Sequence, residues 1–123
     1  MRLFALLSAV ALTASTPAMA ERADLEGAWT VDLSSEDTPY TKAMQLNLQD
    51  DGQVMGSFYD SVIESGRWKT DRGRTCAAFR TSDGAGPYHS AVCFADGMAV
   101  GQTWAEHRNF LFNWNATRQA GGE

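Results

Sequence analysis

The chain has 123 residues, of which 15 are acidic and 10 are basic, so its formal net charge is −5. An acidic surface repels nucleic acid and anionic lipid, and the basic residues are scattered rather than gathered in a stripe, so we expect neither partner. The length suits one domain, and two cysteines and two histidines leave few groups for thiol or metal chemistry.

The first 20 residues have the pattern of a secretory signal peptide. Arg2 supplies a positive charge, residues 3–12 are apolar apart from Ser8, and Ala18-Met19-Ala20 is a small-residue cleavage site. The apolar stretch is shorter than the roughly 20 residues that a membrane-spanning helix needs. We therefore expect cleavage after Ala20, export to the periplasm or the medium, no membrane insertion, and a single domain over residues 21–123.

After a short polar leader at residues 21–26, the chain consists of short segments with strand-forming patterns. In residues 27–33, the apolar Trp29, Val31 and Leu33 share one face, which is the period of a half-buried strand. Similar segments follow at 43–49, 53–59, 62–70, 75–81, 88–94, 98–105 and 110–117. Eight consecutive strands joined by tight turns predict an all-β fold, an eight-stranded antiparallel up-and-down β-barrel, with a two-sheet sandwich as the alternative.

The turn signal Asp51-Gly52 sets the expected register of an early hairpin, because Asp-Gly readily adopts positive φ angles. A turn centred between these two residues places Met44 opposite Tyr59 and Leu48 opposite Met55. We therefore expect Tyr59 and Met55 on the same face as Met44. A second Asp-Gly signal at residues 96–97 predicts another tight hairpin.

Residues 75–94 form the most informative hairpin, with the turn formers of residues 82–87 between two strand-like arms. A turn centred between Gly84 and Ala85 places Cys76 opposite Cys93. Directly opposed residues of antiparallel strands have Cα atoms about 4.5 or 5.5 Å apart, within the range that a disulfide spans. We predict a disulfide between Cys76 and Cys93, with two buried free thiols as the alternative.

The same register divides residues 75–105 into two faces. We expect the more apolar and uncharged face to be interior, and it holds Ala77, Phe79, Tyr88, Val92, Phe94, Ala99, Gly101 and Thr103. The opposite face holds Cys76, Ala78, Arg80, His89, Cys93, Val100, Gln102 and Trp104. If that face were interior instead, its polar and aromatic residues would line a pocket.

Three short motifs resemble the calycin barrels, which include the lipocalins and avidins. They are Leu25-Glu26-Gly27-Ala28-Trp29 at the first strand, Gly52-Gln53-Val54-Met55-Gly56-Ser57-Phe58-Tyr59 at the third, and Trp114-Asn115-Ala116-Thr117-Arg118 at the last. The resemblance implies an eight-stranded barrel that holds a small ligand. Val31 stands where avidins place a ligand-binding Asn, and their strand-three Tyr aligns with Phe58, so the resemblance does not imply biotin binding.

A second resemblance is to small periplasmic inhibitors of secreted metalloproteases. They share the size, the barrel, one disulfide and the Gly-x-Trp opening, and they inhibit with an N-terminal arm. Here about eight residues of the mature chain precede Trp29, which is short for such an arm.

No catalytic set of residues is recognisable, and we expect the protein not to be an enzyme. Arg80 opposite His89 could recognise an anion or be a plain cross-strand polar pair. Glu106-His107 has no second ligand at a metal-binding spacing, so we expect neither metal nor cofactor. Ser82 and Asp83 near His89 offer triad residue types on a glycine-rich turn, which is a poor support for a nucleophile.

The abundant aromatic residues indicate either a ligand cavity lined by rings or a solid core, since an eight-stranded barrel can form both. We predict a small-molecule or peptide binding module whose site lies at the open barrel end, with the residues Tyr59, Arg80, Tyr88, His89 and Trp104. The alternative is a protein–protein module, such as a periplasmic protease inhibitor or an envelope accessory subunit. The sequence leaves the ligand, the partner and the oligomeric state open.

Overall fold

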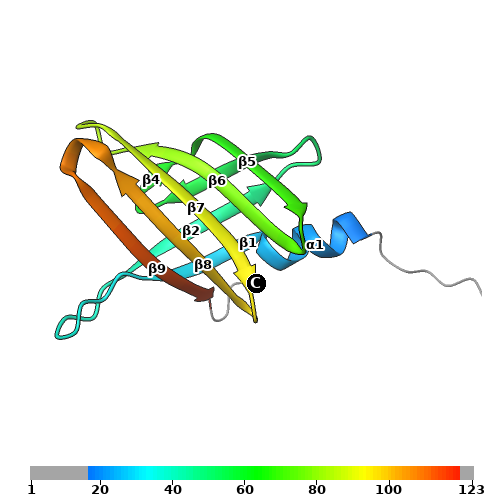
Figure 1. The fold of residues 1–123 in the computed structure, drawn as a ribbon, viewed down its shortest axis with the longest axis horizontal. Coiled ribbons are helices and arrows are strands. Elements are labelled where there is room, and N and C mark those ends of the chain that lie inside the picture. The colour runs from blue at the N-terminus through cyan, green and yellow to red at the C-terminus, as the bar shows by residue number, and fades with distance from the viewer. Residues whose placement is uncertain (1–16, 120–123) are drawn as a thin grey trace, which may run out of the picture.

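The computed structural model describes residues 17–119 and confirms the predicted closed, all-antiparallel, eight-stranded β-barrel (Figure 1). One α-helix precedes the barrel, and one short 3₁₀ helix connects its last two strands. The elements are α1 Pro17–Leu25, β1 Gly27–Asp32, β2 Thr41–Leu48, β3 Gln53–Phe58, β4 Ser61–Val62, β5 Glu64–Asp71, β6 Arg74–Ser82, β7 Pro87–Ala95, β8 Met98–Ala105, η1 Glu106–Arg108 and β9 Phe110–Arg118.

The strands follow one another around the barrel in chain order. β9 pairs with β1, and the pairing of β2 with β3 completes the circle, so each of the eight long strands has a neighbour on both sides. The two-residue strand β4 pairs with the end of β3 before the chain enters β5. Closure leaves no long strand edge free for pairing with another chain.

Two of the three predicted hairpin registers are confirmed. Cys76 lies opposite Cys93 in the β6–β7 pair, and Phe94 lies opposite Ala99 in the β7–β8 pair. The β2–β3 register is wrong by one residue, because Met44 lies opposite Phe58 and not opposite Tyr59.

The cause of the β2–β3 error is a turn longer than expected. Gln49 and Gln53 are joined by a backbone hydrogen bond, which leaves three residues in the turn and Gly52 at φ 91°. A shift of one residue exchanges the two faces of a strand. Val54 and Phe58 are therefore buried, and Met55 lies outside with 49% of its surface exposed.

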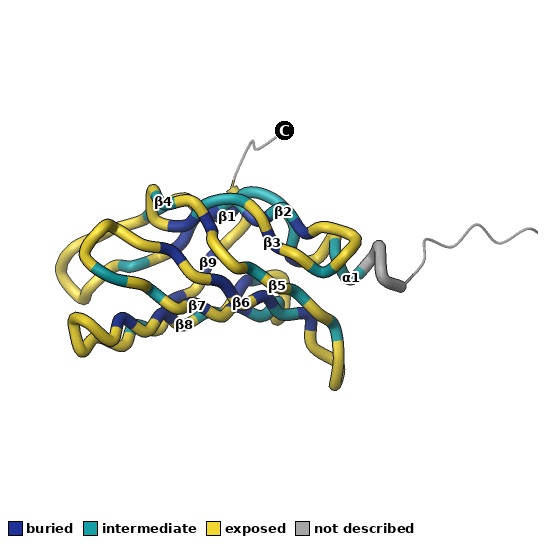
Figure 2. Tube along the Cα trace, turned by 90° about the horizontal axis from the view of Figure 1, so that it is seen from above, coloured by how far each residue is buried: buried dark blue, intermediate teal, exposed yellow. Residues whose placement is uncertain are grey.

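The face of β6, β7 and β8 that points into the barrel is the one that the sequence analysis expected to be interior. Ala77, Phe79, Val92, Ala99 and Thr103 are buried, whereas the opposite face is mostly exposed to solvent. Buried and exposed positions alternate along the barrel wall (Figure 2). The Cys76–Cys93 disulfide lies on the outward face with its Cα atoms 4.0 Å apart, closer than the spacing predicted from strand geometry, and the predicted pairing is confirmed.

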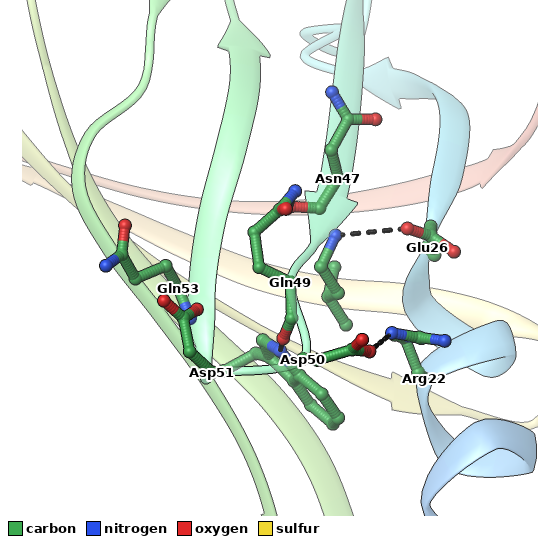
Figure 3. A network of polar contacts seen from close by, with 9 residues as sticks. Arg22, Glu26, Asn47, Gln49, Asp50, Asp51 and Gln53 are labelled. Atoms are coloured by element: carbon green, nitrogen blue, oxygen red, sulfur yellow. Dashed lines mark hydrogen bonds and ion pairs between the residues drawn. The ribbon is translucent and has the colours of Figure 1, made fainter.

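Residues 21–25, expected as part of a polar leader, belong to α1, which lies across one end of the barrel (Figure 1). Leu25 is fully buried in the core, and its carbonyl accepts a hydrogen bond of 2.9 Å from Trp29 Nε1. The Arg22 side chain pairs with Asp50 in the β2–β3 turn, and Glu26 Oε1 accepts from the Leu48 amide at 3.2 Å (Figure 3). The segment thus closes this end, which we call the closed end.

Arg118 at the end of β9 fastens the same segment. Its guanidinium donates to the carbonyls of Ala23, Asp24 and Glu26 at 2.7–2.8 Å. It also lies 4.5 Å from the centroid of the Trp29 ring, which adds a cation–π contact. The first and last segments of the barrel are therefore joined through one side chain.

The predicted signal peptide lies mostly outside the described residues, since the description begins at residue 17. The backbone of residues 17–20 forms the first part of α1. Within the described residues, no helix is both long and apolar enough to cross a membrane.

Replacing Arg118 by Ala should destabilise the barrel by about 1–3 kcal/mol, because three hydrogen bonds from a charged group and a cation–π contact are lost. Urea unfolding of the purified protein measures this difference. The matched control is Arg74→Ala, at an exposed position on β6, where we expect a change within about 0.5 kcal/mol. Equal stability of the two variants would contradict the role given to Arg118.

Candidate functional site

A cavity of about 550 Å³ that opens to solvent lies at the end of the barrel opposite α1, which we call the mouth end. This end carries the β1–β2, β3–β4 and β6–β7 connections and η1 (Figure 1). The cavity is lined by Leu33, Tyr40, Phe58, Tyr59, Ser61, Thr81, Asp83, Tyr88, Thr103, Arg108, Phe110 and Phe112. Seven of these twelve are aliphatic or aromatic, so most of the wall is apolar.

A cluster of aromatic side chains separates the cavity from the core toward the closed end. The ring of Phe58 lies 5.5 Å from Phe79 and 5.3 Å from Trp114, measured between centroids. Trp114 packs directly against Gly101 on the neighbouring strand, where a Cβ atom would overlap its ring. The glycine therefore leaves room for the Trp114 ring against β8, and Phe58, which packs on that ring, lines the cavity.

Asp83, Tyr88 and Arg108 form a charged cluster at the mouth. The Tyr88 hydroxyl donates to Asp83 Oδ2 at 2.6 Å, and Arg108 approaches the same oxygen at 3.4 Å. The Tyr88 hydrogen bond, followed by the Ala85 amide and the Arg108 charge, holds the pKa of the Asp83 carboxyl below its ordinary value. The same hydrogen bond raises the pKa of Tyr88.

Tyr40, Lys42, Tyr59 and Asp60 form a second cluster at the mouth. The hydroxyls of Tyr40 and Tyr59 are hydrogen-bonded, and this bond raises the pKa of Tyr59. Lys42 Nζ donates to Asp60 Oδ2 at 2.6 Å and lies 5.0 Å from the Tyr59 ring centroid. The hydrogen bond to Asp60 raises the pKa of Lys42.

The β3–β4 turn that carries Tyr59 is conformationally unusual. Tyr59 and Asp60 have φ angles of 51° and 65°, a region that non-glycine residues seldom adopt. The Tyr40 and Lys42 contacts oppose the cost of this conformation and hold the Tyr59 ring at the cavity wall.

The β6–β7 turn and η1 are packed against each other beside the charged cluster. The His107 ring lies edge-on to Tyr88, with centroids 5.1 Å apart. It also covers Gly86, where a Cβ atom would come within 2.6 Å of the imidazole. His107 is thereby a packing residue of the mouth, and it fixes the segment from which Arg108 extends.

Of the five residues predicted to bind a ligand, the structure brings two to the cavity. Tyr59 and Tyr88 line it. Arg80, His89 and Trp104 do not, because they form a row of neighbours on the outward face of β6, β7 and β8. Arg80 is paired there with Glu64 at 3.5 Å.

Several lining residues were missed by the sequence analysis. Ser61 has no distinctive pattern, and Tyr40 and Arg108 lie in connections where no strand period indicates a direction. One signal was available: Thr81 has the same parity as Phe79 on the predicted interior face, so its inward orientation could have been read from the sequence.

The described residues contain no group of three or more His, Cys, Asp or Glu side chains that could hold a metal ion. Comparisons with protein-family models, with curated proteins and with solved structures found no match for this chain. The closed antiparallel barrel is compatible with the calycin-like shape that the sequence resemblance implies. The shape is all that the structure adds to that resemblance.

Replacing Tyr88 by Phe should raise the pKa of Asp83 toward the ordinary value of about 3.9, because the carboxylate loses its strongest hydrogen bond. A carboxyl whose folded-state pKa is lowered contributes stability above its unfolded pKa, and loses it as the pH falls through the folded value. Carboxyl NMR titration measures the shift. Tyr59→Phe, at the other cluster, should leave the Asp83 titration unchanged, and an unchanged titration in Tyr88→Phe would contradict the assignment.

Proposed function

We propose that the protein is an exported binding module that holds a small molecule in the cavity at the mouth end. The observation that carries the proposal is the cavity itself, about 550 Å³ in volume, apolar along most of its wall and polar at the mouth. Sites for small organic ligands typically have volumes of about 300–1,000 Å³, apolar walls and a few placed polar groups.

The polar clusters at the mouth support this function. Among the described residues, the only charged side chains that line the cavity are those of Asp83 and Arg108. They form an ion pair with each other. The rest of the lining consists of aromatic rings, Leu33, Ser61 and two threonines. A ligand with an apolar body fits such a cavity better than a highly charged peptide, which would leave charges without partners.

The proposal includes no catalytic activity. The residue types of a hydrolytic triad are engaged elsewhere: the Asp83 carboxylate is bonded to Tyr88, and Ser82 Oγ accepts from the Gly84 amide. His89 lies on the outward face and His107 packs over Gly86. These engagements favour binding over turnover.

The alternative of a protease inhibitor with an N-terminal arm receives less support. After cleavage at Ala20, the arm would consist of residues 21–26. Within that segment Arg22 pairs with Asp50, Leu25 is buried, and Arg118 holds three of its carbonyls. A segment held in this way cannot extend into the active site of a protease without leaving the barrel.

The disulfide supports the proposed export, because disulfides form and persist in oxidising compartments such as the periplasm.

The full-length protein expressed in a bacterium should be recovered from the periplasm with Glu21 as its first residue. Intact mass measurement and N-terminal sequencing check this result. Replacing both Ala18 and Ala20 by bulky Leu should block cleavage, because signal peptidases need small residues at these positions. Uncleaved wild-type protein in the cytosol would contradict export.

Ligand binding is tested with 1-aminoanthracene, an apolar fluorescent probe. Ser61 lines the cavity at the mouth, whereas its neighbour Val62 points outward with 73% of its surface exposed. Ser61→Trp should weaken probe binding by about tenfold or more, because the indole fills space that the probe needs. The matched variant Val62→Trp should bind like the wild type.

Fluorescence titration of the three proteins gives the dissociation constants. No binding by the wild type, or equal binding by Ser61→Trp and the wild type, would overturn the proposal that this cavity is the binding site.

A further inference from the structure

Two buried threonines, Thr81 and Thr103, line the cavity, and their hydroxyls are candidate donors to a ligand. Thr81 is only 3% exposed, and among residues 17–119 no hydrogen bond involves its side chain. No side-chain oxygen or nitrogen of the described residues is both sealed from solvent and without a partner. The Thr81 hydroxyl must therefore be open to the cavity that it lines.

Thr103 provides a second donor in one of the two proton arrangements that its hydrogen bond with Ser90 permits. Its Oγ1 accepts from Trp114 Nε1 at 2.9 Å and lies 2.8 Å from Ser90 Oγ. Thr103 and Ser90 together carry two hydroxyl protons, and the bond between them uses one. The other proton has no acceptor among the described residues. When Ser90 is the donor, the spare proton belongs to Thr103, which lines the cavity.

The other groups around the cavity restrict what can meet these protons. The charged lining residues, Asp83 and Arg108, lie at the mouth, where Arg108 Nη2 is 3.4 Å from Asp83 Oδ2. A charge on the inner part of a ligand would find no counter-ion there, which is strongly unfavourable in an apolar site. A pure hydrocarbon would leave the Thr81 hydroxyl without a partner, which also costs binding free energy.

We infer that the ligand is an uncharged, mostly apolar molecule whose buried part carries a hydrogen-bond-accepting oxygen, such as a ketone carbonyl, facing Thr81 or Thr103. The inference rests on the proposed binding function and narrows its ligand to one chemical class. The apolar body lies against Leu33, Phe58 and Phe112, and the oxygen accepts from the threonine side of the wall.

Two probes of nearly equal shape test this class, 2-acetylnaphthalene and 2-isopropenylnaphthalene, because they differ only in an oxygen replaced by CH₂. The wild type should bind the ketone about tenfold more tightly, the effect of one buried hydrogen bond. The double variant Thr81→Val/Thr103→Val should bind the two probes equally. The matched control, Thr30→Val/Thr117→Val, changes a cross-strand pair on the outward face and should keep the preference.

Calorimetric titration of each protein with both probes separates the outcomes. Equal wild-type affinities for the two probes would overturn the ligand class while the proposed binding function stands. Failure of both probes to bind would overturn the binding function as well. Thr81 has no protein partner to lose, but Thr103→Val leaves Trp114 without an acceptor. If the double variant does not fold, the wild-type comparison alone still decides the ligand class.

Discussion

The contact between Arg118 and the segment before β1 determines how the space inside the barrel is distributed. The guanidinium lies against Trp29 and holds three carbonyls around the buried Leu25, so one end of the barrel is filled by side chains. The solid core extends from there to the cluster of Phe58, Phe79 and Trp114. The cavity occupies the remaining length because nothing equivalent to α1 covers the mouth among the described residues.

Most of the fold could be predicted because its determinants are local. Strand alternation and Asp-Gly turns act over a few residues, and they gave eight strands and the correct opposition of Cys76 and Cys93. The predicted β2–β3 register was wrong because turns of two and of three residues share the same Asp-Gly signal. The prediction for residues 21–25 was wrong for a different reason. These residues are held in place by Arg118, which follows Asp24 by 94 residues in the chain. A contact of that range leaves no local pattern.

The candidate site was predictable only as far as strand parity extends. Tyr88 and His89 are adjacent in one strand, so their side chains point to opposite faces, and only Tyr88 lines the cavity. The same alternation of faces places Arg80 and Trp104 away from the cavity, although their neighbours across the sheet were correctly predicted. Tyr40 and Arg108 reach the cavity from connections, whose backbone directions depend on contacts such as His107 over Gly86.

The position of the disulfide divides the barrel into parts of unequal rigidity. Cys76 and Cys93 join β6 and β7 near the closed end, where the core and the Arg118 contacts also lie. The mouth is held by exposed ion pairs and by a turn with two positive φ angles, which are weak constraints by comparison. Local opening has its lowest free energy where buried contacts are fewest. The proposed ligand would therefore exchange through local opening of the mouth loops, on a timescale independent of global unfolding.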